Sequence, residues 1–350
     1  MRVSRTILIA IATLATSPAW PQSGTAAPDL MKQAQGLFKP LPDHPPTLEG
    51  NPATPAKVAL GKMLYFDPRL SASHAISCNT CHIIGMGGVD LQETSLGHRW
   101  QHGSRNAPTV YNAVFNIAQF WDGRAKDLEQ QAGGPMVNPI EMETTEAHVI
   151  EQLSAIPGYK PAFKAAYPSG GDALTFENVR KAIAVFEATL ITPNAPFDRY
   201  LKGDAKALDS GQQAGLALFI NSGCAACHGG MNIGGAMYAP FGVVEKPGAE
   251  LLPPGDKGRF DVTKTASDAY AFRAAPLRNV ALTAPYFHSG KVWDLRQAVA
   301  IMGSSQLGAK LSPGDVDKIT AFLGSLTAEQ PSVLLPTLPP SVASTPRPVP

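Results

Sequence analysis

The sequence predicts a mainly α-helical protein with two similar domains and long loops. Apolar residues recur at helical spacing in several segments, and alternating strand patterns bounded by tight turns are scarce. A Cys-x-x-Cys-His motif occurs twice, and its two histidines, His82 and His228, lie 146 residues apart, about the length of one domain. With 32 glycines and 32 prolines among 350 residues, much of the chain is expected to form loops.

Residues 1–27 are typical of a secretory signal peptide. Arg2 and Arg5 precede an apolar run at residues 7–15, and small residues follow. A membrane-spanning helix is the alternative, but it needs about 20 apolar residues, and Pro18 and Pro21 interrupt this segment. We therefore expect an exported, periplasmic protein without a membrane span.

Seven further segments have helical character. In the first of them, Ala56, Leu60, Met63 and Leu64 share one face of a helix. Aspartate, serine or threonine stands at the start of several segments, where N-caps belong. The predicted helices span residues 56–66, 124–131, 145–155, 176–190, 210–220, 295–302 and 313–326.

A weak internal repeat supports the division into two domains. Leu60 and Gly61 before the first motif resemble Gly215 and Leu216 before the second. Prolines at 193 and 196 end the preceding helix and mark a boundary near residue 200. We expect a first domain over residues 28–200, a second over 201–330, and an extended, poorly ordered, proline-rich tail over 331–350.

The charge balance excludes one class of partner. The chain has 29 Lys and Arg against 28 Asp and Glu, and only 16% of its residues are charged. Nucleic-acid binding requires a basic surface, which this balance does not indicate. We therefore expect no nucleic-acid partner. Hydrophobic residues make up 44% of the chain, which is enough for a folded core.

All four cysteines belong to the two motifs. The motif residues are Cys78, Cys81 and His82 in the first and Cys224, Cys227 and His228 in the second. Two disulfides or a zinc site are the alternatives for an exported protein, but neither accounts for the adjacent histidines. The cysteine pairs of a zinc ribbon also lie only about 15–20 residues apart. Covalent haem attachment accounts for every motif residue, because the two thiols bond the haem and the histidine ligates its iron.

The second axial ligand of each iron determines what the haem does. Methionine opposite histidine raises the reduction potential and suits electron transfer. For the second haem the candidates are Met231, Met237 and Met302, and spacing alone does not choose among them. Methionine is also a common core residue, so each of them has an ordinary structural alternative.

The neighbourhood of the first haem differs. His98 and His102 lie 16 and 20 residues after His82, and either could be an iron ligand or an ordinary loop histidine. Farther along, Trp121, Gln131 and Glu141 could line a distal pocket. Taken alone, the three residues are more typical of a core indole, a solvated helix residue and a capping or surface acid.

Several ordered stretches carry a resemblance to one family. They are LGKMLYFDPRLS, SCNTCH, LGHRWQHGSRNAPTVYNA, FWDGRAKDLEQQAGGPMVNPIEM, GCAACHGG, FRAAPLRNVALTAPYFHSG and AVAIMGSSQLG. Over nearly the whole mature chain the sequence resembles the bacterial dihaem cytochrome c peroxidases. The resemblance implies two cytochrome c-like domains, each enclosing one covalently attached haem. It also implies reduction of hydrogen peroxide to water with electrons from a small c-type cytochrome or copper protein.

The resemblance further implies roles for individual residues. His82 and His98 would be the proximal and distal iron ligands of the N-terminal, peroxide-reducing haem, and Gln131 and Glu141 its pocket pair. In the family, reduction of the C-terminal haem releases the distal histidine. His102 falls where the family motif requires no histidine, so His98 is the expected ligand.

The remaining implied roles concern the second haem and the domain boundary. His228 and Met302 would ligate the iron of the C-terminal, electron-transfer haem, and Trp121 would lie between the haems. A calcium ion between the domains would be bound by Asn106, Thr283 and Pro285. The resemblance also implies a homodimer.

Two rival functions fit part of the pattern. A dihaem electron carrier would keep both irons six-coordinate and would not need Gln131 and Glu141. A relative of the dihaem enzymes that oxidise another protein to mature a quinone cofactor would carry tyrosine at the position of Met302.

Overall fold

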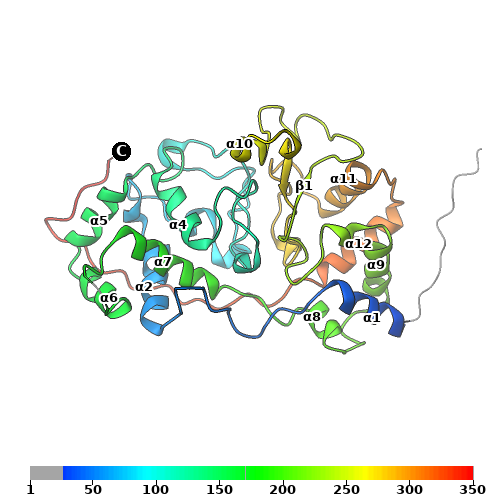
Figure 1. The fold of residues 1–350 in the computed structure, drawn as a ribbon, viewed down its shortest axis with the longest axis horizontal. Helices are drawn as coiled ribbons and strands as arrows, with labels where there is room; N and C mark the ends of the chain where they lie inside the picture. The colour runs from blue at the N-terminus through cyan, green and yellow to red at the C-terminus, as the bar shows by residue number, and fades with distance from the viewer. Residues whose placement is uncertain (1–26, 170, 350) are drawn as a thin grey trace, which may run out of the picture.

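The structure is a computed structural model that describes residues 27–169 and 171–349, arranged as two helical lobes side by side (Figure 1). The predicted signal peptide lies, apart from Ala27, outside these residues. The α-helices are α1 (Ala27–Leu37), α2 (Pro55–Phe66), α3 (Cys78–Cys81), α4 (Leu128–Val137), α5 (Glu146–Ala155), α6 (Tyr159–Ala166), α7 (Phe176–Ala188), α8 (Pro196–Leu201), α9 (Ser210–Asn221), α10 (Phe260–Thr263), α11 (Leu295–Leu307) and α12 (Pro313–Gly324).

Short elements complete the chain. The 3₁₀ turns are η1 (Pro68–Leu70), η2 (Ile84–Met86), η3 (His98–Trp100), η4 (Ala113–Phe115), η5 (Cys224–Ala226), η6 (Ala266–Asp268) and η7 (Val280–Leu282). Strands β1 (Tyr238–Pro240) and β2 (Ala271–Arg273) form an antiparallel pair in which Tyr238 is opposite Arg273. The prediction of a mainly α protein is confirmed. Within the described residues, no helix is long and apolar enough to cross a membrane.

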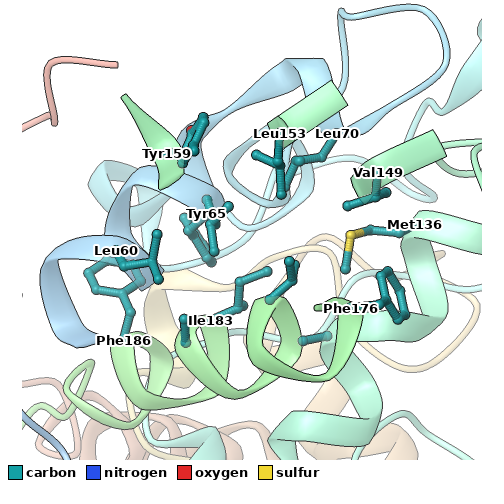
Figure 2. Close-up of a cluster of buried hydrophobic side chains, with 14 of the residues drawn as sticks. Leu60, Tyr65, Leu70, Met136, Val149, Leu153, Tyr159, Phe176, Ile183 and Phe186 are labelled. Atoms are coloured by element: carbon teal, nitrogen blue, oxygen red, sulfur yellow. The ribbon is translucent and has the colours of Figure 1, made fainter. Parts of the chain in front are cut away.

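The first lobe is built on the packing of α2 against α7, with α4, α5 and α6 around them. Leu60 and Tyr65 of α2 face Ile183 and Phe186 of α7 in a fully buried core (Figure 2). The Tyr65 hydroxyl donates a hydrogen bond to the carbonyl of His82, 2.6 Å away. The core of this lobe therefore fixes the backbone of the first Cys-x-x-Cys-His motif.

The second lobe repeats this arrangement with α9 packed against α12. A Cβ atom added to Gly61 of α2 would lie 1.9 Å from the carbonyl oxygen of Ala182, and one added to Gly215 of α9 would lie 1.9 Å from that of Lys318. Both helix pairs thus cross so closely that only glycine fits at the contact. The weak repeat in the sequence reflects this shared crossing.

Helix caps explain where the predicted helices begin. Thr54, Thr145, Thr175 and Asp209 each accept a hydrogen bond from a backbone N–H in the first turn of the helix that follows. The helix predicted from residue 124 starts later, at Leu128, because the Asp127 side chain caps it. Helices α1, α3, α6, α8 and α10 and the small sheet were not predicted.

The two ends of the chain cross the predicted domain boundaries. Helix α1 packs with the second lobe, where Leu30, Ala34 and Phe38 belong to the buried core (Figure 1). The proline-rich tail runs back to the first lobe, where Arg69 donates hydrogen bonds to the carbonyl of Pro339 and the hydroxyl of Ser341. We expected a poorly ordered tail; these bonds instead hold it against the body of the protein.

A buried polar cluster joins the lobes. The Thr192 hydroxyl accepts hydrogen bonds from the amides of Asn112, in the first lobe, and Asn279, in the second, at 2.8 and 2.9 Å. The backbone N–H of Thr192 donates to Asn112 Oδ1. Because all three side chains are buried, the cluster fixes how the lobes sit together.

Candidate functional site

The first lobe contains a cavity of about 140 Å³ beside the first motif. Its walls include Cys81, His82, Gln131 and Glu141. Cys78 and Cys81 begin and end the single turn of α3, which is capped by Ser77 together with Thr80. This turn presents both cysteines and the following histidine from one short segment.

His82 is prepared as a metal ligand. Its Nδ1 lies 2.9 Å from the carbonyl oxygen of Pro108, so Nδ1 carries the proton and Nε2 keeps its lone pair. Burial lowers the pKa of His82, which keeps the imidazole neutral. A neutral imidazole with one nitrogen anchored is the usual form of a ligating histidine.

His98 does not line this cavity. The side chain is buried, and its Nε2 lies 2.6 Å from a carboxylate oxygen of Glu143. Its backbone N–H is held by the carbonyls of Ile140 and Glu141, the segment that carries the pocket carboxyl. His102, the other candidate, lies with Nδ1 3.3 Å from the hydroxyl of Thr94.

Gln131 and Glu141 do meet at the cavity. Gln131 projects from α4, and Glu141 follows the end of that helix. The Asn138 amide donates to Oε1 of Glu141 at 2.8 Å and orients the carboxyl. Burial raises the pKa of Glu141, while Arg124 and Asn138 oppose the shift. The carboxyl can therefore hold a proton at a higher pH than an exposed glutamate.

Sequence reasoning missed a second carboxyl in this wall. Glu187 of α7 also lines the cavity and is 6% exposed. Burial raises the pKa of Glu187 to about 8. No local motif marks this residue, since its neighbours in the chain are ordinary core positions of a helix.

The second lobe contains a larger cavity of about 250 Å³. Cys224, Cys227, His228 and Met302 all line it. Of the three methionines considered from the sequence, Met231 and Met237 are not among the described residues in its walls. Met302 reaches the cavity from α11, on an element separate from the motif.

His228 repeats the arrangement of His82. Its Nδ1 lies 3.0 Å from the carbonyl oxygen of Ala275, and burial lowers its pKa. The two carbonyl acceptors, from Pro108 and Ala275, belong to the similar stretches NAPT and RAAP. Both lobes thus hold the motif histidine by a hydrogen bond from Nδ1 to a backbone carbonyl.

Trp121 and Asn106 line both cavities, so they form the wall between them. The Trp121 indole donates its Nε1–H to the carbonyl of Asn106 at 2.9 Å. Thr283 and Pro285 line the second cavity with Asn106. These three residues of the predicted calcium site therefore line one cavity.

The two cavities fit covalently attached haems. All four cysteines, which lie within the described residues, are free thiols whose pKa values burial raises. The two pairs lie in different lobes, so they cannot form one four-cysteine zinc site. Each histidine has an anchored Nδ1 beside a cavity, which matches an axial iron ligand.

Comparison with known proteins agrees with this geometry. The sequence profile described as Di-haem cytochrome c peroxidase matches residues 55–206. The chain is 58% identical to cytochrome c551 peroxidase of Pseudomonas aeruginosa over 341 residues, covering 97% of this chain and 98% of that protein. The chain belongs to the di-haem cytochrome c peroxidase family. The predicted family, the enzyme class of cytochrome-c peroxidase and the two c-type haems are confirmed.

One further relative and one solved structure are also similar to this chain. Cytochrome c551 peroxidase of Nitrosomonas europaea is 49% identical over 82% of this chain and 85% of its own length. Among solved structures, a MauG-like protein associated with microbial copper homeostasis superimposes with a TM-score of 0.73 at 27% identity, covering 83% of this chain and 95% of that one.

Proposed function

We propose that this peroxidase reduces hydrogen peroxide at the haem of the first lobe, with electrons that enter through the haem of the second lobe. In this proposal Cys78 and Cys81 attach the first haem and Cys224 and Cys227 the second, while the following histidines are the proximal ligands. When bound, the two haems supply the one-electron redox chemistry of their irons.

The observation that carries the proposal is the difference between the cavities. The second cavity is lined by Met302 as well as His228, which together could supply the two axial ligands of a six-coordinate electron-transfer haem. Among the described residues, the first cavity presents no methionine and no histidine besides His82. Gln131 and Glu141 line this cavity instead, which suits a substrate rather than a ligand.

The chain's own residues supply the proton chemistry. Reducing one peroxide to two waters consumes two electrons and two protons. Glu141 would take a proton from one peroxide oxygen at its Oε2 and return it to the departing oxygen, while Asn138 holds Oε1. The Gln131 amide would orient the two oxygens. Such acid–base help is worth about 10²–10⁴ in rate.

The switch that the family resemblance implies would involve His98. In the described structure its imidazole contacts Glu143 and does not line the first cavity. We propose that His98 ligates the first iron in the resting oxidised enzyme and leaves it on half-reduction. Its loop contains Gly97 and Gly103, which permit such a change.

The wall between the cavities is the proposed electron route. Trp121 contacts both cavities and is held by the Asn106 carbonyl. We propose that Asn106, Thr283 and Pro285 bind a calcium ion at this wall through amide and carbonyl oxygens. The proposed donor is a small c-type cytochrome, with a copper protein as the other outcome, and the proposed state is a periplasmic homodimer.

Substitution of Glu141 tests the proposed function. We expect Glu141→Gln to lower kcat for peroxide by about 10²–10⁴, with both haems still attached and the KM for the donor unchanged. Glu146→Gln, an exposed carboxylate in the first turn of α5, is the matched control and should keep wild-type activity. Full peroxidase activity in Glu141→Gln would overturn the acid–base role proposed for Glu141.

A further inference from the structure

One charged side chain stands in the otherwise neutral wall of the second cavity. Apolar residues dominate this wall, and Arg273 of β2 is the one lysine, arginine, aspartate or glutamate among the described residues that line it. A permanent charge facing an apolar cavity requires a specific reason, because burial of an unpaired ion is costly.

Arg273 is both buried and incompletely bonded. The residue is 3% exposed, its Nε donates to the carbonyl of Phe120 at 3.3 Å, and its Nη1 has no hydrogen-bond partner within the described part of the chain. Burial lowers the pKa of Arg273 to about 10, so the guanidinium remains charged at neutral pH. A buried cation is therefore left with an unused donor.

Two other arginines, the buried Arg278 and the half-buried Arg105, show how this protein normally neutralises such a charge. Arg278 makes two hydrogen bonds to the carboxylate of Asp198, at 2.8 and 3.0 Å. Arg105 contacts the carboxylates of Asp122 and Asp256, both at 2.6 Å. Among the described residues, no carboxylate is paired with Arg273. Arg273 thus differs from its counterparts in lacking an anion from the protein.

The neighbouring titratable groups do not supply this anion. His288 stacks on the ring of Phe272 at 4.0 Å in the same wall, and burial lowers its pKa to about 4, so it is neutral. Asp256, 3.9 Å from the His288 Nε2, is already engaged by Arg105. The missing anion must therefore come from the molecule that fills the cavity.

A haem carries two propionate carboxylates, the only anionic groups on its periphery. We propose that Arg273 binds a propionate of the haem in the second lobe and orients that haem toward Trp121. This inference rests on the haem assignment proposed above. The backbone N–H of Arg273 donates to the Trp121 carbonyl at 2.7 Å, and its Nε to the adjacent Phe120 carbonyl. The propionate edge would therefore face the wall shared with the first cavity.

The positive charge also has an electrical consequence. A cation beside the haem favours the reduced iron, which carries one positive charge less than the oxidised iron. Arg273 would therefore help to keep the second haem at high potential, in addition to Met302. Loss of the charge should make this haem harder to reduce.

The test uses the haem-loaded protein and three variants. Arg273→Gln removes the positive charge, and Arg273→Lys keeps the charge but lacks the planar guanidinium. Arg259→Gln is the control. It removes the charge of a half-buried arginine that lies over the Tyr238 ring and does not line the cavity. Haem content is counted by absorption first, because fewer than two haems per chain would contradict the haem assignment itself rather than the role of Arg273.

With two haems present, we expect Arg273→Gln to shift the propionate bending band in the resonance Raman spectrum. It should also lower the equilibrium constant for reduction of the Met-ligated haem by about tenfold. Arg273→Lys should be intermediate, and Arg259→Gln should resemble the wild type. A wild-type Raman band and potential in Arg273→Gln would overturn the proposal.

Should Arg273→Gln fail to fold, a crystal structure of the haem-loaded wild type decides the question. A propionate oxygen within hydrogen-bonding distance of the Arg273 guanidinium supports the proposal. A guanidinium that contacts only protein and water overturns it.

Discussion

At the scale of single residues, Glu187 shows how burial beside the first cavity changes the pKa of a side chain. Its carboxyl is buried in the wall, and burial raises its pKa to about 8. An unfolded chain releases this proton near pH 4.5, the ordinary value for glutamate. Between these two pH values the folded protein holds a proton that the unfolded chain has lost, so Glu187 destabilises the fold increasingly as the pH rises through that window.

Substitution of Glu187 tests whether its carboxyl lowers the stability of the fold as the pH rises. We expect Glu187→Gln to flatten the fall of unfolding free energy between pH 4.5 and about 8, and to stabilise the protein at pH 8 by no more than about 5 kcal/mol. Denaturant unfolding of the haem-loaded protein at pH 5 and pH 8 measures it. Glu177→Gln on the same helix is the control, because Lys181 holds the pKa of Glu177 below its usual range. An unchanged pH slope in Glu187→Gln would contradict the assignment.

The residues that spacing alone predicted share one property. Cys78, Cys81 and His82 act together and are also adjacent in the chain, so their spacing alone indicates the chemistry. Glu187 and Arg273 gain significance only from burial against a cavity built by distant segments. No spacing rule detects that kind of residue.

At the scale of elements, the two lobes depend on the same close helix crossing. Gly61 lets α2 approach the backbone of α7, and Gly215 lets α9 approach that of α12. A methyl group at either position would collide with a main-chain carbonyl, which cannot move aside as a flexible side chain could.

We expect Gly61→Ala to destabilise the first lobe and Gly215→Ala the second, each by at least about 2 kcal/mol. Thermal unfolding followed by the absorption of each haem would locate the damage. Gly36→Ala in α1 is the control, because nothing lies within 4 Å of the added atom and alanine is the better helix former. Equal melting temperatures for Gly61→Ala and Gly36→Ala would refute the crossing argument.

Sequence patterns predicted the long capped helices because capping residues and apolar spacing are local signals. Asp209 before α9 and Ser312 before α12 are examples, since each side chain bonds the helix it precedes. Strands β1 and β2 have only three residues each, too few for a recognisable alternation. Helix α8 has only six residues, which is also too short for periodicity.

At the scale of the whole molecule, segments from both ends tie the lobes together. The N-terminal helix α1 joins the second lobe and the C-terminal tail joins the first (Figure 1). Between them lies the buried cluster of Thr192, Asn112 and Asn279. The packing of each end of the chain on the opposite lobe depends on contacts between residues far apart in sequence, so the motifs and helix patterns could not predict it.

Thr192→Val keeps the shape of the side chain and removes the hydroxyl that two buried amides share. We expect it to lower the unfolding free energy by about 2–4 kcal/mol, because both amides lose an acceptor. Thr192→Ser retains the hydroxyl and should lose clearly less. If denaturant unfolding shows the valine and serine variants to be equally stable, the cluster does not hold the lobes together.

The central claim is that the two haem sites differ at the sixth iron position, with Met302 facing one cavity and Gln131 and Glu141 facing the other. An EPR spectrum of the enzyme poised with one electron per molecule tests this most directly. We predict that the Met-ligated haem is reduced and silent, while the other gives a high-spin ferric signal that peroxide removes. A spectrum in which the remaining ferric haem stays low-spin and does not respond to peroxide would contradict the claim.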